Sequence, residues 1–206
     1  MDIRDDQFLW VEKYRPQKID DCVLPEALKK TFKEYIAQGE LPSFLFSGTA
    51  GVGKTTVAKA LCNEIGAEYI MINGSDEGRS IDVLRTTIKS FASTVSLTDA
   101  KKVIIVDEAD YMNPASVQPA LRNLMEDYSQ TVRFILTCNY IDKIIEPLFS
   151  RTQVFKLEPP TMKDVAMYIV KILTKENITY DMPTVATVVK EYYPDIRKIV
   201  NVVQQS

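Results

Sequence analysis

The chain has 206 residues, of which 46% are hydrophobic and 26% charged, a composition typical of a soluble globular protein with one large and one small domain. Its formal net charge of −3 gives no overall attraction to nucleic acid, so any contact with DNA requires a local cluster of positive side chains. Because there is no histidine and the three cysteines are widely separated, a zinc site of cysteine and histidine ligands is excluded.

The sequence also indicates no membrane contact. Residues 1–10 are acidic where a signal peptide is basic, and no apolar stretch approaches the roughly 20 residues of a membrane span. We therefore expect a cytoplasmic protein whose cysteines are reduced.

The first part of the chain alternates between short apolar strands and amphipathic helices. Pro25, an apolar stripe and Gly39 predict a helix with proline at its first position and glycine just beyond its end. Apolar runs predict strands at 44–46, 69–72, 103–106, 134–136 and 154–155. Apolar residues at helical spacing predict helices that end at Gly66, span about 80–93, and run from an Asn113-Pro114 cap to Tyr128. This alternation predicts an α/β fold with a parallel sheet covered by helices on both faces.

The strands stop at the double proline 159–160, and three helical patterns follow. Thr161 and Asp164 resemble a capping box at the start of the first of these helices, with Asp in place of the preferred Glu or Gln. We therefore predict an α/β domain over residues 1–156 and a small all-helical lid domain over residues 157–206.

A glycine-rich loop follows the first predicted strand and matches the Walker A pattern, G-x-x-x-x-G-K-[ST]. Its backbone N–H groups and the following helix N-terminus favour phosphate, while Lys54 reaches the β- and γ-phosphates and the Thr55 hydroxyl coordinates magnesium. The predicted nucleotide-contacting residues are Gly48, Thr49, Ala50, Gly51, Val52, Gly53, Lys54, Thr55 and Thr56.

Two carboxylates end the apolar strand at 103–106, in the Walker B arrangement. Asp107 is predicted to complete the magnesium shell together with Thr55, and Glu108 to polarise the water that attacks the γ-phosphate. Together the two motifs predict a P-loop enzyme that binds a nucleotide with Mg²⁺ and hydrolyses it; the resemblance described next implies that the nucleotide is ATP.

Beyond these general motifs, the chain resembles the AAA+ clamp-loader ATPases: the small subunits of replication factor C and especially the ATPase subunit of T-even phage clamp loaders. The resemblance covers nearly the whole chain, and its most specific part is the sequence EKYRP at 12–16. The other matching segments are NGSD at 73–76, DEAD at 107–110, LTCN at 136–139, SR at 150–151 and PDIR at 194–197.

The resemblance implies further roles around the nucleotide. Asn139 corresponds to sensor 1, at the γ-phosphate or the attacking water, and Arg197 to sensor 2, which reaches the nucleotide from the lid. Arg151 corresponds to the arginine finger that acts on the ATP of the adjacent subunit, although Thr152 replaces the family's cysteine after it. The segment beside adenine corresponds to Val11, Tyr14, Arg15 and Pro16. Without the resemblance, Arg151 and Arg197 would read as surface arginines and Asn139 as a turn residue.

The resemblance also implies two macromolecular surfaces. The DNA-binding residues would be Arg79, Ser80 and Arg85, at and near a helix N-terminus that favours phosphate, with a solvated helix face as the alternative. The sliding clamp would meet the opposite end of that helix and the loop beyond it, through Val95 and Leu97 and through Phe91 unless Phe91 is a core residue.

The implied function is therefore that of an ATPase subunit in a sliding-clamp loader, working with other loader subunits, the clamp and primer-template DNA. Its location would be the cytoplasm, of the host cell if the chain is viral. The C-terminal collar domain of the family is not in this sequence, as expected of a truncated chain or a short relative. Two alternatives remain open: another AAA+ motor, such as a branch-migration helicase or a protein-remodelling ATPase, and a scaffold subunit that binds nucleotide without hydrolysing it.

Overall fold

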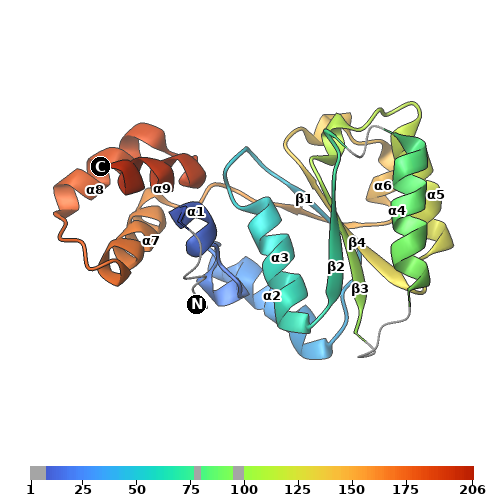
Figure 1. Ribbon diagram of the computed structural model, residues 1–206, viewed down its shortest axis with the longest axis horizontal. Helices are drawn as coiled ribbons and strands as arrows, with labels where there is room; N and C mark the ends of the chain where they lie inside the picture. The colour runs from blue at the N-terminus through green and yellow to red at the C-terminus, as the bar shows by residue number, and fades with distance from the viewer. Residues whose placement is uncertain (1–7, 77–79, 95–99) are drawn as a thin grey trace.

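The computed structural model describes residues 8–76, 80–94 and 100–206. Arg79, Val95 and Leu97, expected at the DNA or clamp surfaces, lie outside these ranges. Figure 1 shows an α/β part with a central sheet and a smaller, purely helical part beside it. Within the described ranges, no helix is long and apolar enough to cross a lipid bilayer.

All strand pairs of the sheet are parallel, and the strand order is β2-β3-β4-β1-β5. The strands are β1 (Phe44–Ser47), β2 (Glu68–Asn73), β3 (Lys102–Asp107), β4 (Val132–Cys138) and β5 (Gln153–Lys156). Ser47 aligns with Cys138, and Val106 with Leu136, so β1, β3 and β4 end at the same edge. The predicted parallel sheet is confirmed, and its central strands are almost entirely buried, as expected for strands covered on both faces.

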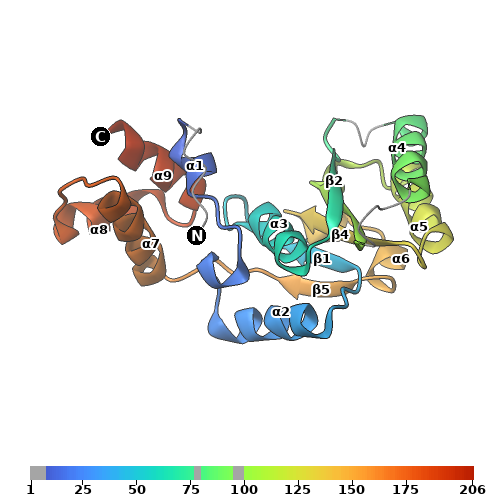
Figure 2. The same cartoon turned by 60° about the horizontal axis from the view of Figure 1, so that its bottom comes forward.

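Helices cover both faces of the sheet (Figures 1 and 2). One face packs against α2 (Glu26–Gln38) and α3 (Lys54–Ile65), where Phe32 meets the rings of Phe44, Phe46 and Phe155. The other face packs against α4 (Ile81–Ser93), α5 (Val117–Asp127) and α6 (Glu146–Phe149). Short 3₁₀ turns lie at Ile19–Asp21, Ala109–Tyr111 and Ile141–Lys143.

Helix ends differ from the sequence prediction at two positions. Pro25 has an extended ψ of 140°, so it flanks α2 at the N-cap position and the helix begins at Glu26. Asn113 caps a turn, because its Oδ1 accepts hydrogen bonds from the N–H groups of Ala115 (2.8 Å) and Ser116 (3.2 Å), and α5 begins only at Val117. Local side-chain hydrogen bonding of Asn competes with helix formation at this point.

The C-terminal part consists of α7 (Met162–Lys175), α8 (Met182–Tyr192) and α9 (Ile196–Gln205). Their N-caps are Thr161, Asp181 and Asp195, whose side chains each accept a backbone N–H, as helix starts require. The short helix α1 (Trp10–Lys13) packs into the same hydrophobic cluster through Trp10 and Tyr14. Burial of these two aromatic rings therefore joins α1 to α7, α8 and α9, the helices expected to form the lid, although the sequence-based division assigns all of residues 1–156 to the α/β domain.

Lys102, at the start of β3, is a lysine with only 7% of its surface exposed. Its Nζ donates to the carbonyl of Phe91 (2.8 Å), to the hydroxyl of Thr94 (2.8 Å) and to the carbonyl of Thr94. All three ammonium protons are thus used at the C-terminal end of α4, where a positive charge also complements the helix dipole. This contact ties α4 to the sheet.

Replacing Lys102 with Met should lower the free energy of unfolding by about 1–3 kcal/mol, because it keeps the apolar stem and removes the charged donor that connects β3 to the carbonyl of Phe91 and to both oxygens of Thr94. Urea unfolding measures this loss. The matched control is Lys89→Met on the exposed side of α4, which should change stability by less than about 0.5 kcal/mol. Equal effects of the two substitutions would contradict the role given to Lys102.

Candidate functional site

A cavity of about 340 Å³ lies at the edge where β1, β3 and β4 end, between the α/β part and the lid. In parallel sheets this edge is where ligands usually bind. From the α/β part, the cavity is lined by residues 50–57, Asn73, Asp107, Glu108 and residues 137–139. From the rest of the chain it is lined by Val11, Arg15, Pro16, Cys22, Val23, Tyr168, Ile196, Arg197 and Val200.

The glycine-rich loop connects β1 to α3, as the sequence predicts. Gly51 and Gly53 have φ angles of 79° and 92°, in the left-handed region that favours glycine. A Cβ on Gly51 would lie 2.4 Å from Oδ1 of Asp195 in the lid, so a side chain there is also excluded sterically. The loop leads directly into the N-terminus of α3, where unpaired N–H groups and the helix dipole favour an anion.

Lys54 is 8% exposed and points into this loop. Its Nζ donates to the carbonyl of Gly48 (2.9 Å), the carbonyl of Thr49 (2.8 Å) and Oδ1 of Asn139 (2.8 Å). Burial lowers the pKa of Lys54, while nearby negative charge such as that of Asp107 acts in the opposite direction. The structure therefore brings together Lys54 and Asn139, two residues that are 85 positions apart in the sequence.

The two carboxylates of the predicted Walker B motif lie at the cavity wall beside the loop. Oδ1 of Asp107 accepts hydrogen bonds from the hydroxyls of Thr55 (2.7 Å) and Thr137 (2.6 Å). Glu108 has a left-handed φ of 56°, and its N–H donates to the hydroxyl of Thr137 at 3.1 Å. The arrangement places the Thr55 hydroxyl, two carboxylates and the buried ammonium group of Lys54 around one cavity.

The N-terminal wall of the cavity differs from the expectation at one residue. Val11, Arg15 and Pro16 line the cavity, but Tyr14 does not. Tyr14 is 1% exposed, and its hydroxyl donates to Oε1 of Glu176 at 2.5 Å. Residues four apart lie on the same face of a helical turn. Val11 and Arg15 form one such pair and line the cavity. Trp10 and Tyr14 form another pair and pack against the C-terminal helices. The proposed adenine contact of Tyr14 is therefore wrong for the tyrosine ring.

Several lining residues have no counterpart in the sequence prediction. Val23, Tyr168, Ile196 and Val200 give the cavity apolar and aromatic walls beside Cys22. Ile196 and Val200 are four residues apart and share one face of α9, a spacing that could have indicated them once Arg197 was assigned. Burial raises the pKa of the Cys22 thiol to about 12, so this wall carries no thiolate at neutral pH.

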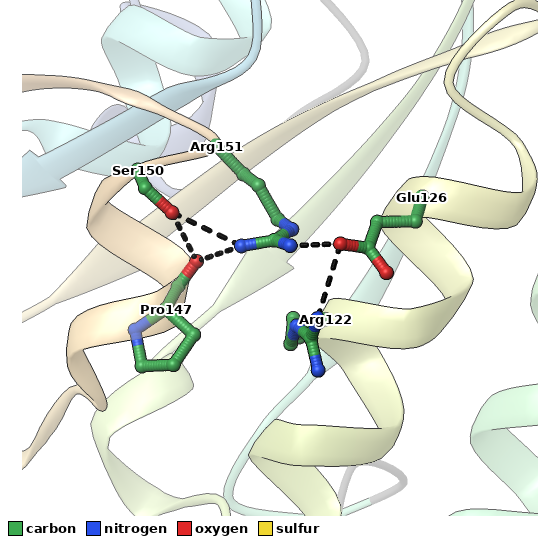
Figure 3. A network of polar contacts seen from close by, with 5 residues as sticks. All are labelled: Arg122, Glu126, Pro147, Ser150 and Arg151. Carbon is green, nitrogen blue, oxygen red and sulfur yellow. Dashed lines mark hydrogen bonds and ion pairs between the residues drawn. The ribbon is translucent and has the colours of Figure 1, made fainter.

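Arg151 does not line the cavity of its own chain, and Figure 3 shows the polar contacts that it makes instead. Its guanidinium forms an ion pair with Glu126 and donates to the carbonyl of Pro147 (2.7 Å) and the hydroxyl of Ser150 (3.0 Å). Glu126 also accepts a hydrogen bond from Arg122 at 3.2 Å, so one carboxylate holds two arginines at the surface. The contacts of Arg151 are therefore with Glu126, Pro147 and Ser150 and not with the residues around the cavity of its own chain.

Of the residues expected at the DNA surface, the structure describes Ser80 and Arg85, and neither lines the cavity. Ser80 is the N-cap of α4, where its hydroxyl accepts the N–H of Val83 at 3.4 Å, and both Ser80 and Arg85 are exposed. Phe91 is half-buried and packs against the hydrophobic core, which favours the core alternative for this residue.

Comparison with known sequences connects this geometry to a family. The profile of the family described as "ATPase family associated with various cellular activities (AAA)" matches residues 44–159, which include the glycine-rich loop, both carboxylates and Asn139. The chain belongs to the AAA family. A RuvB variant from Thermotoga maritima shares the AAA-type fold found here, with a TM-score of 0.75 and 20% identity over 93% of this chain and 64% of that one.

Curated relatives extend the similarity beyond the AAA core. The replication factor C small subunit of Sulfurisphaera tokodaii is 40% identical over 98% of this chain. The sliding-clamp-loader large subunit of Escherichia phage RB69 is 43% identical over 94% of it. The chain spans about 63% of the length of these relatives.

The contact between α1 and the lid should depend on pH. Oε1 of Glu176 accepts hydrogen bonds from Lys13 (2.7 Å) and Tyr14 (2.5 Å), and these partners lower the pKa of Glu176 below its usual 4.5. A depressed folded-state pKa adds stability above the unfolded value, and this stability is lost as the pH falls through the folded value. Glu176→Gln should therefore lower the free energy of unfolding at pH 7 and have a much smaller effect near pH ~3.

Urea unfolding of both chains at the two pH values measures this difference. Glu34→Gln, on the exposed side of α2, is the matched control and should change stability little at either pH. A destabilisation by Glu176→Gln that is equally large at both pH values would show that the charge of Glu176 is not its source.

Proposed function

We propose that this AAA protein is an ATP-hydrolysing subunit of a DNA sliding-clamp loader, which couples ATP binding and hydrolysis to the opening and loading of the clamp on primer-template DNA. The carrying observation is the convergence of Lys54, Thr55, Asp107, Glu108 and Asn139 on one cavity beneath a helical lid. The clamp-loader part rests on the similarity, over nearly the whole chain, to relatives named replication factor C small subunit and sliding-clamp-loader large subunit.

The cavity suits ATP in both shape and polarity. The loop amides and the N-terminus of α3 receive the phosphates, and Lys54 supplies the buried positive charge beside them. Val11, Val23, Ile196 and Val200 form an apolar wall that suits an adenine ring. Arg197, in the first turn of α9, adds a cation from the lid, so bound nucleotide would connect the lid to the α/β part.

Thr55 and Asp107 are the residues that would hold a magnesium ion. Their oxygens are 2.7 Å apart, and hydroxyl and carboxylate oxygens are ligands that Mg²⁺ accepts. Within the described ranges, no group of three or more His, Cys, Asp or Glu side chains forms a metal cage. This fits Mg²⁺, which usually takes one or two protein ligands and completes its shell with phosphates and water. When bound, the ion would neutralise negative charge on the phosphates.

The remaining groups supply the hydrolytic chemistry. Glu108 orients and polarises the attacking water, and Asn139, fixed beside Lys54, holds the water or the γ-phosphate in line. Lys54 stabilises charge that develops on the phosphate oxygens in the transition state. The Asn139 backbone is itself held by Asp110, whose Oδ2 accepts its N–H at 3.3 Å.

The proposed partners are other loader subunits, the clamp and DNA, and the place of work is the cytoplasm, of the host cell if the chain is viral. Arg151 is exposed enough, at 25% of its side chain, to reach the ATP of a neighbouring subunit after leaving Glu126. The proposed DNA contacts are Arg79, Ser80 and Arg85, of which Ser80 and Arg85 are exposed at the N-terminal part of α4. These residues would contact the phosphate backbone of DNA, so their contribution to binding would not depend on the base sequence.

Two substitutions should separate nucleotide binding from hydrolysis. Lys54→Ala should abolish tight ATP binding, because it removes the cation at the phosphates, whereas Glu108→Gln should retain binding and lose turnover. Binding is measured with a fluorescent ATP analogue and turnover by phosphate release from the full-length protein in its assembly, with and without clamp and DNA. Hydrolysis by Glu108→Gln at the unmodified rate would overturn the role of this carboxylate, and a lack of any response to clamp and DNA would overturn the loader assignment.

Arg151 should act on the neighbouring subunit. Arg151→Ala should slow hydrolysis in the assembly by roughly 10³–10⁵-fold, as loss of an arginine finger does in other P-loop enzymes, and leave ATP binding intact. Mixed assemblies of Arg151→Ala and Lys54→Ala subunits should recover part of the activity, because the second variant still offers Arg151 to the intact site of the first. If mixed assemblies form but hydrolyse no faster than the sum of the two variants, action in trans is wrong.

A further inference from the structure

Thr137 is a buried polar residue that no motif assigns, in the penultimate position of β4. It is 1% exposed and borders the cavity beneath the two carboxylates. Its hydroxyl lies 2.6 Å from Oδ1 of Asp107 and 3.1 Å from the backbone nitrogen of Glu108. An ionised carboxylate only accepts and a backbone N–H only donates, so the hydroxyl donates its single proton to Asp107 and accepts the N–H of Glu108.

The backbone pairing between β3 and β4 stops just before this point. Its last aligned residues are Val106 and Leu136, after which Asp107 ends β3 and Glu108 follows the strand. The Thr137 side chain continues the connection from β4 to both residues after the backbone ladder has ended. This hydroxyl therefore couples the positions of the two carboxylates to the rigid centre of the sheet.

The backbone of Glu108 needs such a contact. Its φ of 56° is in the left-handed region, which residues other than glycine rarely adopt unless their surroundings hold them there. The hydrogen bond of its N–H to Thr137 favours this conformation, and the conformation sets the direction in which the Glu108 side chain leaves the backbone. The carbonyl of Glu108 also accepts the N–H of Tyr111 at 3.0 Å, so this backbone conformation is held by one hydrogen bond at the N–H and one at the carbonyl.

The opposite strand end is held by a different residue. Oδ2 of Asp110 accepts the N–H groups of Asn139 (3.3 Å) and Tyr140 (3.1 Å), so Asn139 keeps its backbone contact without Thr137. Asp107 also accepts the hydroxyl of Thr55, but Thr55 lies in the first turn of α3 and is itself a proposed contact of the nucleotide and Mg²⁺. From the interior of the sheet, Thr137 thus contacts the carboxylate of Asp107 and the backbone N–H of Glu108.

We propose that Thr137 is a positioning residue whose hydroxyl fixes the direction of Asp107 and Glu108 toward the phosphates of the nucleotide. This inference rests on the proposed ATPase function. Thr137 acts through the two carboxylates and touches no reacting atom itself. Loss of its hydroxyl should therefore reduce the rate of hydrolysis much more than the affinity for ATP.

The test compares Thr137→Val, which removes the hydroxyl at nearly constant shape, with Thr137→Ser, which keeps it. In the full-length assembly with clamp and DNA, Thr137→Val should lower kcat about 10–100-fold, as loss of a supporting hydrogen bond does at metal sites, with less than about 3-fold change in the Kd of a fluorescent ATP analogue. Thr137→Ser should restore kcat to within a few-fold. Thr31→Val, on α2, removes a hydroxyl bonded to the carbonyl of Ala27 far from the carboxylates and should leave kcat unchanged.

Two further measurements depend on the carboxylates specifically. Combined with Glu108→Gln, Thr137→Val should add little further loss of turnover, because residues that act as a unit are not additive. The Mg²⁺ concentration needed for half-maximal binding of the ATP analogue should rise several-fold in Thr137→Val and not in Thr137→Ser, because Asp107 is less well held. This second readout does not depend on hydrolysis.

The outcomes separate the two proposals. An unmodified assembly that binds ATP and does not hydrolyse it overturns the proposed function. An unmodified assembly that hydrolyses ATP, beside a folded Thr137→Val assembly with the same kcat and the same Mg²⁺ dependence, overturns the role of Thr137 alone. If the valine chain fails to fold, Thr137→Cys takes its place: a weak S–H donor of similar size should give a kcat below that of serine, and equal rates overturn the proposal.

Discussion

The parallel pairing of β1, β3 and β4 is the constraint on which the site depends. Register places Ser47 beside Cys138, and Val106 beside Leu136, so the glycine-rich loop, the two carboxylates and Asn139 all emerge at one edge. No local interaction could bring Lys54 to Asn139, because 85 residues of chain separate them. The buried apolar strands, covered on both faces, fix this register, since moving a strand by one residue would exchange the faces of all its side chains.

The edge of the sheet supplies only part of the cavity, and the helical part supplies the rest. The three N-capped helices form one hydrophobic cluster with Trp10 and Tyr14. Val11, next to these aromatic residues, and Ile196 and Val200 of α9 line the cavity. Asp195 combines two roles here, because it caps α9 and lies against Gly51 of the loop. A change in the position of α9 would therefore move Asp195 relative to the glycine-rich loop, which is a physical route by which the proposed nucleotide and the C-terminal helices could influence each other.

Periodicity and motif spacing predicted the sheet, most helices and the motif residues at the cavity, because these features depend on local sequence. The errors arise where tertiary packing decides. Tyr14 belongs to a nucleotide-associated segment in the resemblance, yet burial of its ring against the lid turns it away from the cavity. The proposed role of Thr137 could not be predicted, since a threonine in an apolar strand looks like an ordinary strand-forming residue. Only the folded sheet brings one acceptor, the Asp107 carboxylate, and one donor, the Glu108 N–H, within reach of its hydroxyl.

The charged groups of the molecule divide into two sets with different surroundings. Lys54 is buried and Asp107 and Glu108 half-buried around the cavity, where low solvent exposure strengthens electrostatic interactions with a phosphate. Arg122, Glu126 and Arg151 form ion pairs away from the cavity (Figure 3), where side-chain exposures of 39%, 44% and 25% allow more screening by solvent. A fixed inner set suits groups that must be preorganised for phosphate chemistry. A solvent-screened outer set would suit the proposed action of Arg151 on a second molecule, for which the guanidinium would have to leave Glu126 while the inner set stays in place in its own chain.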